Sequence, residues 1–233
     1  MKIGIIGGGP GGLYFAILMK RADAANEIDL YERNAPDDTF GWGVVFSDET
    51  LYHLEDADKE TYDEITSTFA TWGCIDIHYR GEVVRSCGHG FCGISRMELL
   101  QILQRRAEGL GVNLHYRTEI DDLDAFSDCD LVVGADGINS MVRDRYADHF
   151  EPTIDTRKCK FIWLGTTLPL PAFTFFLRAN KHGFFQVHAY QFNSRESTFI
   201  VECDEQSWRN AGLDTATTEE TVAYLESVFE EDL

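Results

Sequence analysis

Two patterns of hydrophobic and polar positions follow one another along this chain of 233 residues. Up to about residue 145, short apolar runs alternate with stretches whose apolar residues recur at helical spacing, as Leu13, Ala16 and Ile17 do. Such alternation predicts strands joined by helices, and therefore a largely parallel, doubly wound α/β sheet. The runs at residues 27–32, 112–116 and 130–137 are further expected strands.

From residue 158 the pattern changes to four strand-like runs with short polar turns and no helix between them. They cover residues 161–166, 173–178, 184–191 and 198–203, and they predict an added antiparallel β-sheet. Val222, Leu225 and Phe229 then form the apolar stripe of a last helix. We therefore expect a first domain over residues 1–157, with a small hairpin inserted at 69–93, and a second over 158–233.

The run at 184–191 has two unlike faces. Residues 185, 187 and 189 are apolar and predict core. The other face mixes aromatic and polar side chains, and it either walls a pocket or lies half-exposed on the sheet: Phe184, Gln186, His188 and Tyr190.

The first apolar run is followed by Gly7, Gly9 and Gly12, which have the spacing G-x-G-x-x-G. Pro10 and Gly11 lie between Gly9 and Gly12. This spacing between a strand and a helix is typical of dinucleotide sites, where backbone amides at the helix N-terminus bind a pyrophosphate. Glu32 follows about twenty residues after Gly12, where such sites place a carboxylate for the ribose. The alternative is a structural glycine turn without a ligand.

Charge narrows the range of partners. The chain has 20 basic and 40 acidic residues, a formal net charge of -20, which disfavours nucleic acids and anionic membranes. An anionic cofactor stays compatible, because backbone amides and a local field bind it.

Six cysteines are scattered without a C-x-x-C pair. Cys87, His89 and Cys92 come nearest to the ligand spacing of a metal site, but no second pair of ligand residues follows. We therefore expect no bound metal, and we expect the cysteines to be free thiols. No stretch has the roughly 18 apolar residues of a membrane span. These features predict a soluble, cytoplasmic protein.

Three more positions are candidates for ligand binding. Trp42 stands between two glycines, either in a ligand loop or in an ordinary strand. Arg96 falls in the first turn of a helix that Ser95 would cap, where a cation opposes the helix dipole, so it either meets an anion or is a surface arginine. Asp136, with Gly137, ends a buried strand at a sharp turn.

The glycine loop with Glu32, Arg96 on its helix, and residues 134–140 followed by Arg143 together resemble the FAD-dependent aromatic hydroxylases, the group of para-hydroxybenzoate hydroxylase. Within this group the chain looks most like hydroxylases of aromatic acyl-CoA thioesters. The strings that carry this likeness lie at residues 31–34, 41–45, 162–166 and 188–190.

The resemblance implies a Rossmann-like FAD-binding domain, with NADH or NADPH as co-substrate, and a role in the catabolism of aromatic compounds. It implies hydroxylation, with molecular oxygen, of an aromatic thioester such as salicylyl-CoA or 2-aminobenzoyl-CoA. Substrate contacts would come from Gln186, His188 and Tyr190. The residues implied to bind the cofactor are Gly7, Gly9, Pro10, Gly11, Gly12, Glu32, Arg33, Trp42, Arg96, Asp136 and Gly137.

One departure from the family pattern is that a second FAD motif, a Gly-Asp pair expected after the substrate sheet, does not occur before Leu233. We therefore expect an N-terminal fragment or a truncated gene product, inactive by itself. The full-length protein would be a homodimer or carry a C-terminal reductase domain. Two alternatives are an NAD(P)H-dependent flavin reductase or dehydrogenase, and a non-catalytic flavin-binding fragment.

Overall fold

The computed structural model describes residues 1–233, which form two compact units. Unit 1 contains residues 1–40, 52–67 and 96–155, and unit 2 contains residues 41–51, 68–95 and 156–233. The hairpin that we expected as an insertion in the first domain makes its contacts within unit 2, as do residues 41–51.

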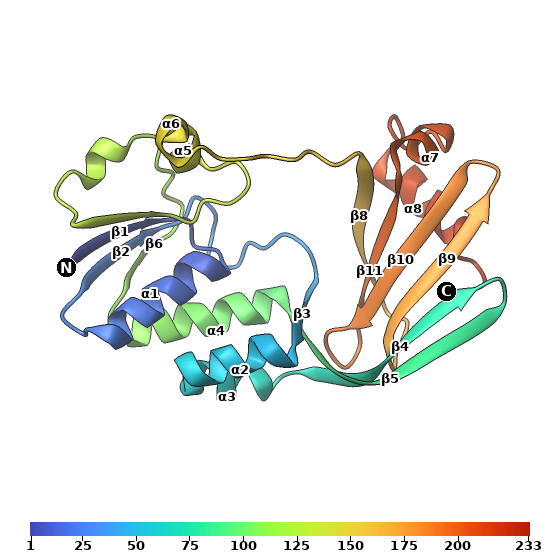
Figure 1. The fold of residues 1–233 in the computed structure, drawn as a ribbon, viewed down its shortest axis with the longest axis horizontal. Coiled ribbons are helices and arrows are strands. Elements are labelled where there is room, and N and C mark those ends of the chain that lie inside the picture. Colours follow the sequence, from blue (N-terminus) through green and yellow to red (C-terminus); the bar gives the residue numbers. More distant parts are fainter. The chain divides into compact units, whose positions relative to one another are not determined.

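Unit 1 is built on a four-stranded parallel sheet. Its strands are β1 (Lys2–Ile6), β2 (Glu27–Tyr31), β6 (Asn113–His115) and β7 (Leu131–Gly134), in the order β6-β2-β1-β7 (Figure 1). Strand β1 pairs in parallel with both β2 and β7, and β2 pairs in parallel with β6. The predicted parallel α/β sheet is confirmed.

Helices α1 (Pro10–Ala22) and α4 (Arg96–Gly109) pack against each other in unit 1 (Figure 1). On β1, Ile3 and Ile5 are fully buried. Gly4 points to the opposite side of the sheet, because a β-carbon there would collide with the ring of Phe126. The sheet is therefore covered on both faces, on one of them by the 3₁₀ helix η1 (Leu123–Phe126).

The acidic stretch that follows β3 (Gly43–Ser47) forms two helices, α2 (Asp48–Ala57) and α3 (Lys59–Thr66). The break falls at Asp58, whose side chain accepts hydrogen bonds from Thr61 and Arg106. Two short helices, α5 (Met141–Arg145) and α6 (Ala147–Phe150), follow β7.

Unit 2 contains a seven-stranded sheet in the order β3-β5-β4-β9-β10-β11-β8. The four predicted runs are confirmed as the antiparallel strands β8 to β11. β4 joins β9 in parallel, because the hairpin arrives from another part of the chain, so the sheet is mixed. The strands are β3 (Gly43–Ser47), β4 (Ala70–Tyr79), β5 (Glu82–Ser95), β8 (Cys159–Thr166), β9 (Phe173–Asn180), β10 (Gly183–Gln191) and β11 (Ser197–Asp204).

The predicted hairpin is formed by β4 and β5, and it turns at Arg80 and Gly81. Both have positive φ, 53° and 80°, as a two-residue turn between twisted antiparallel strands requires. The turn sets the register that places Asp76 opposite Arg85, and these two side chains form an ion pair.

The expectation of free thiols is wrong for Cys74 and Cys87, which form a disulfide. They are 13 residues apart in sequence, but the register of the hairpin places them directly opposite each other. Spacing alone does not reveal such a pair, because its formation depends on where the turn falls. Cys92, Cys129, Cys159 and Cys203 are free.

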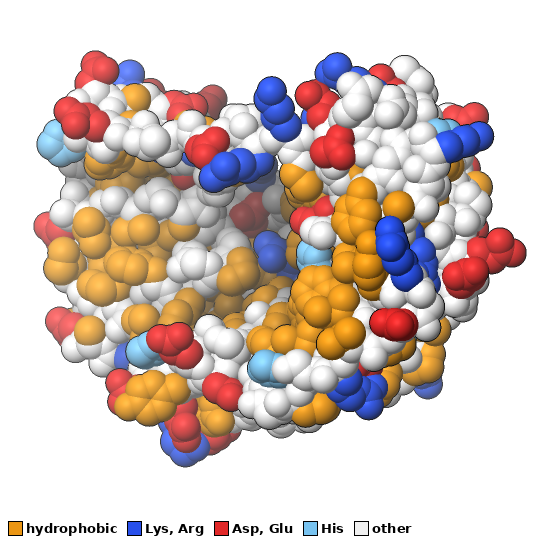
Figure 2. Space-filling model, turned by 45° about the vertical axis from the view of Figure 1, so that its right-hand side comes forward, with side chains coloured by type: hydrophobic (Ala, Val, Ile, Leu, Met, Phe, Trp, Pro, Cys, Tyr) orange, Lys and Arg blue, Asp and Glu red, His pale blue; other side chains and the backbone are white.

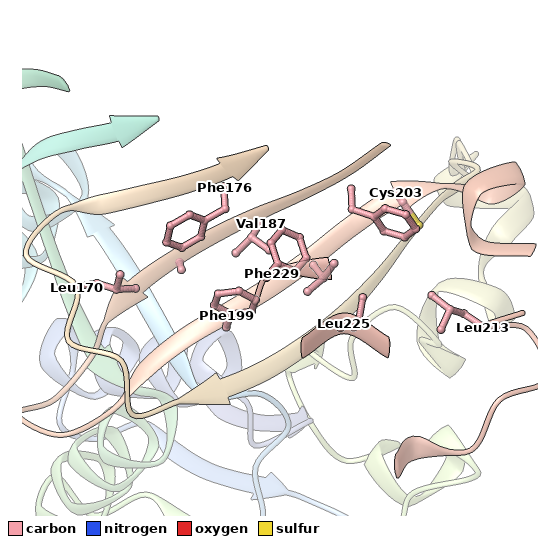
Figure 3. Packing of buried hydrophobic residues seen from close by; sticks show 11 residues of the cluster. Leu170, Phe176, Val187, Phe199, Cys203, Leu213, Leu225 and Phe229 are labelled. Atoms are coloured by element: carbon pink, nitrogen blue, oxygen red, sulfur yellow. The ribbon is translucent and has the colours of Figure 1, made fainter. Parts of the chain in front are cut away.

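The main core of unit 2 lies between one face of this sheet and the C-terminal helices α7 (Glu205–Asn210) and α8 (Thr218–Val228) (Figure 3). Phe185, Val187 and Ala189 are fully buried, as the alternation on β10 predicted. From the last helix, Leu225 and Phe229 enter the same cluster. None of the helices is long and apolar enough to cross a membrane.

Candidate functional site

The glycine loop between β1 and α1 has the geometry that its spacing predicts. Gly7 has φ of 108°, and a β-carbon there would lie 2.3 Å from the carbonyl oxygen of Ala135. A β-carbon on Gly12 would lie 2.1 Å from the carbonyl oxygen of Gly7, so the helix packs directly on the turn. At Gly9 a β-carbon would meet no atom within 4 Å. The loop is therefore closed at two glycines and open to a ligand at the third.

This loop borders a cavity of about 310 Å³ that is lined entirely by residues of unit 1. Seven of the residues predicted to bind the cofactor line it: Gly7, Gly9, Glu32, Arg33, Arg96, Asp136 and Gly137. They come from the carboxyl ends of β1, β2 and β7 and from the start of α4. Ligands of open parallel sheets bind at this edge.

Three buried polar atoms of the cavity lining have no hydrogen-bond partner within the chain: Arg96 Nε, Thr39 Oγ1 and Tyr116 Oη. Leaving such a group unsatisfied costs free energy, so its presence in a cavity indicates a polar ligand. Burial raises the pKa of Tyr116 to about 12, which keeps its hydroxyl a neutral donor. Thr39 and Tyr116 were missed in the sequence, because nothing in their local pattern distinguishes them from loop or strand residues.

Glu32 is held at the end of β2 by three hydrogen bonds to its carboxylate. Gly8 N donates to one oxygen at 2.7 Å, and Asn34 donates to the other from its backbone N at 2.8 Å and its side-chain Nδ2 at 2.7 Å. A carboxylate has about four acceptor positions, so one stays available to a hydroxyl group in the cavity. The predicted ribose contact is compatible with this geometry.

Arg96 is the first residue of α4 and forms no ion pair within the chain. Its charge lies at the positive end of the helix dipole, where a cation is unfavourable. An anionic group in the cavity would pair with the guanidinium and would also offset the unfavourable interaction with the helix dipole. The phosphates of a dinucleotide have this charge.

Asp136 lines the cavity, but its carboxylate is largely used to anchor the start of α5. It accepts hydrogen bonds from Ser140 Oγ at 2.6 Å and from Met141 N at 2.7 Å. Ser140 in turn caps this helix. The structure therefore shows Asp136 shaping the wall of the cavity, and its contact with a cofactor stays a prediction.

Four predicted residues lie outside the lining of this cavity. Pro10, Gly11 and Gly12 form the first turn of α1, whose early N–H groups have no partner within the helix. Trp42 belongs to unit 2 and lines a different cavity, of about 540 Å³, where its ring packs on Gly165. Its predicted cofactor contact has no support from the arrangement within either unit.

The three predicted substrate residues lie on the sheet face of unit 2 that is opposite the helical core. Strand register extends this front face across the sheet: it comprises the even-numbered residues of β10, β11 and residues 82–86, and the odd-numbered residues of β8, β9 and residues 75–79. Stacked rings lie at its centre. The ring centre of Phe173 is 5.5 Å from that of Tyr190 and 6.2 Å from that of His188.

Gln186 and His188 share a partner on the front face that sequence reasoning missed, Glu202 of β11. Gln186 Nε2 donates to Glu202 Oε2 at 2.8 Å, and His188 Nδ1 lies 3.6 Å from the same oxygen. Burial lowers the pKa of His188 more than Glu202 raises it, so the imidazole is neutral at pH 7. Tyr190 instead donates to the carbonyl oxygen of Gly43 at 2.9 Å. Its hydroxyl is used in the fold, and its ring remains part of the face.

The whole chain, residues 1–233, matches the family model described as "FAD binding domain". Two curated relatives agree with this match. Salicyloyl-CoA 5-hydroxylase from Streptomyces sp. is 43% identical over 98% of this chain and 46% of its own length. A 3-hydroxy-4-methyl-anthranilyl-[aryl-carrier protein] 5-monooxygenase from Streptosporangium sibiricum is 32% identical over 88% of this chain and 57% of its own length. This chain thus spans about half the length of these relatives.

Among solved structures, the fold is similar to that of 2-methyl-3-hydroxypyridine-5-carboxylic acid oxygenase. The TM-score is 0.76 at 19% sequence identity, and the match covers 98% of this chain and 64% of the other. The likeness supports the predicted fold class, a Rossmann-like α/β domain with an added β-sheet layer.

Proposed function

The chain belongs to the FAD binding domain family, and we propose that it is part of an FAD-dependent, NAD(P)H-driven monooxygenase that hydroxylates an aromatic acyl thioester such as salicylyl-CoA or 2-aminobenzoyl-CoA. The observation that carries the proposal is the cavity at the glycine loop, with an open Gly9 and an unpaired Arg96.

The residues of this cavity fit FAD. The first turn of α1 would bind the pyrophosphate through backbone amides, Glu32 the adenosine ribose, and Arg96 a phosphate or ribityl oxygen. Thr39 and Tyr116 add donors that have no partner within the chain. The bound flavin would supply the redox chemistry, passing electrons from NAD(P)H to molecular oxygen and an oxygen atom to the aromatic ring.

The front face of unit 2 supports an aromatic substrate. Phe173 and Phe175 are partly exposed and offer ring surfaces for stacking, whereas the ring of Tyr190 is buried against Phe173 and Trp72. Neutral His188, whose Nε2 has no partner within the chain, can accept a proton from a ring hydroxyl. Trp163, which strand register places on this face, also keeps a buried indole N–H without an acceptor in the chain. A thioester is favoured by the names of the two relatives, which specify an acyl-CoA substrate and an acyl group on a carrier protein.

The test uses the purified full-length protein. We expect a flavin absorbance spectrum, oxidation of NADH or NADPH that salicylyl-CoA stimulates more than salicylate does, and one atom of ¹⁸O₂ in the product. Reduced-nicotinamide oxidation without labelled product would identify a flavin reductase or dehydrogenase instead. Flavin binding without turnover would identify a non-catalytic protein. A homodimer or a fused reductase domain, and a cytoplasmic location, belong to the same proposal and would be checked on this preparation and by cell fractionation.

Glu32→Ala is expected to weaken FAD binding by about 10- to 100-fold, because a hydrogen bond to a charged acceptor contributes roughly 1.5–3 kcal/mol. Titration of the apoprotein with FAD, followed by flavin fluorescence, measures the change. Glu27→Ala is the matched control, since Glu27 is exposed at the other end of the same strand. Equal affinities of Glu32→Ala and wild type would reject the ribose assignment.

A further inference from the structure

The strands of the front face of unit 2 contribute carboxylates but no lysine or arginine. None of its strand residues, as defined above, is lysine or arginine, whereas Glu82, Glu202 and Asp204 have side chains on this face. Asp204 is at the end of β11 and caps α7, and Glu82 is at the hairpin turn. Glu202 is therefore the carboxylate nearest to the predicted substrate residues Gln186 and His188.

Basic residues of the sheet that could offset a bound anion are engaged elsewhere. Arg85 pairs with Asp76 and Arg178 pairs with Asp232, and the register places both arginines on the opposite face. Arg80 is at the hairpin turn, with its guanidinium 5.1 Å from the ring centre of the front-face residue Tyr79, and β4 is three strands away from the β11 strand of Glu202. The local charges agree with the wider surface, where acidic side chains are spread over the visible face (Figure 2).

The network around Glu202 fixes the carboxylate instead of neutralising it. Gln186 donates one hydrogen bond from a neutral amide, and the His188 ring is neutral at pH 7 because burial lowers its pKa. The side chain of Glu202 is 28% exposed, so it is partly withdrawn from solvent screening. A ligand at this face therefore meets a fixed negative charge.

We propose that Glu202 determines specificity by disfavouring aromatic substrates with a free carboxylate, so that the front face selects those whose carboxyl group is esterified. The inference rests on the proposed function. A thioester carbonyl has no net charge, and it still accepts hydrogen bonds. A free carboxylate would gain the same hydrogen bonds but lose affinity through like-charge repulsion, which is selection by an unfavourable interaction.

The test compares wild type with Glu202→Gln, which keeps the size and hydrogen-bonding capacity of the side chain and removes its charge. We expect the ratio of kcat/KM for salicylate to kcat/KM for salicylyl-CoA to rise by about tenfold, or about 1.4 kcal/mol, in the variant. Glu82→Gln is the matched control, because it removes a charge from the same face at the hairpin turn, and its ratio should equal that of wild type. An unchanged ratio in Glu202→Gln would overturn the inference.

A second measurement needs no variant. We expect benzamide to inhibit hydroxylation of salicylyl-CoA by the wild-type protein with an inhibition constant about ten times lower than that of benzoate at low salt. This difference should shrink as the salt concentration rises. Equal inhibition at low salt would contradict the proposal even if Glu202→Gln did not fold. A wild-type protein that hydroxylates neither salicylate nor its thioester would instead refute the proposed function.

Discussion

Asp58→Ala is expected to lower the free energy of unfolding by about 3–5 kcal/mol, because it removes the buried counter-charge of Arg106 and leaves this guanidinium only the exposed Glu60 as an ion-pair partner. The Asp58 side chain is only 2% exposed and that of its partner Arg106 is 15% exposed. Two hydrogen bonds of 3.0 and 3.1 Å join them, and Arg21 lies 3.4 Å from the same carboxylate. Asp58 thereby connects the start of α3 to α4 and α1. Urea-induced unfolding, followed by circular dichroism, measures the loss.

The matched control for this variant is Glu60→Ala. Glu60 also lies within an ion-pair distance of Arg106, at 2.7 Å, but its side chain is 71% exposed. Solvent screening limits such a pair to about 0–1 kcal/mol. Losses of similar size in the two variants would show that burial of Asp58 does not set the strength of its interaction.

The same ion pair gives the stability a defined dependence on pH. Burial by itself would raise the pKa of Asp58, but hydrogen bonds from Arg106 and Thr61 and the nearby positive charges lower it below its ordinary value. The unfolded chain therefore binds this proton at a higher pH than the folded chain does. The contribution of Asp58 is complete above the ordinary aspartate pKa of about 3.9 and is lost as the pH falls through the folded-state value. The Asp58→Ala variant should lack this component of acid unfolding.

Features fixed by local chain geometry could be predicted from the sequence. Gly7 and Gly12 have no room for a β-carbon, so their spacing is required by the turn itself. The positive φ values of Arg80 and Gly81 follow from a two-residue hairpin loop, and alternation on β10 separates the core face from the front face. In each case, a few neighbouring residues contain the information.

Features that depend on register between distant segments were missed. Glu202 faces Gln186 only because β10 and β11 pair as they do, and Cys74 meets Cys87 through the register of the hairpin. Tyr116 reaches the cavity because the chain beyond β6 passes beside the loop after β2. The assignment of Trp42 to unit 2 likewise depends on which strands residues 41–51 join. The pattern of residues along the sequence does not specify which distant strands pair or in which register.

Arg96→Met is expected to weaken FAD binding by about 100-fold or more, since a guanidinium supplies both charge and up to two charge-assisted hydrogen bonds of roughly 1.5–3 kcal/mol each. Arg96 lines the cavity with a buried Nε that has no partner. Arg96→Lys should restore part of the affinity, because an ammonium keeps the charge but not the planar pair of donors. Arg105→Met is the control, since Arg105 lies on the same helix but has an exposed side chain outside the lining of the cavity.

The stability of the apoprotein distinguishes a binding role from a structural one. If Arg96 is held for an anionic ligand, the ligand-free chain bears the cost of a cation at the start of α4 and of an unsatisfied buried donor. Arg96→Met should then unfold in urea at the same or a higher midpoint than wild type without FAD, while FAD stabilises the variant less than it stabilises wild type. A lower midpoint without FAD, together with unchanged FAD affinity, would show that Arg96 supports the fold and does not bind the cofactor.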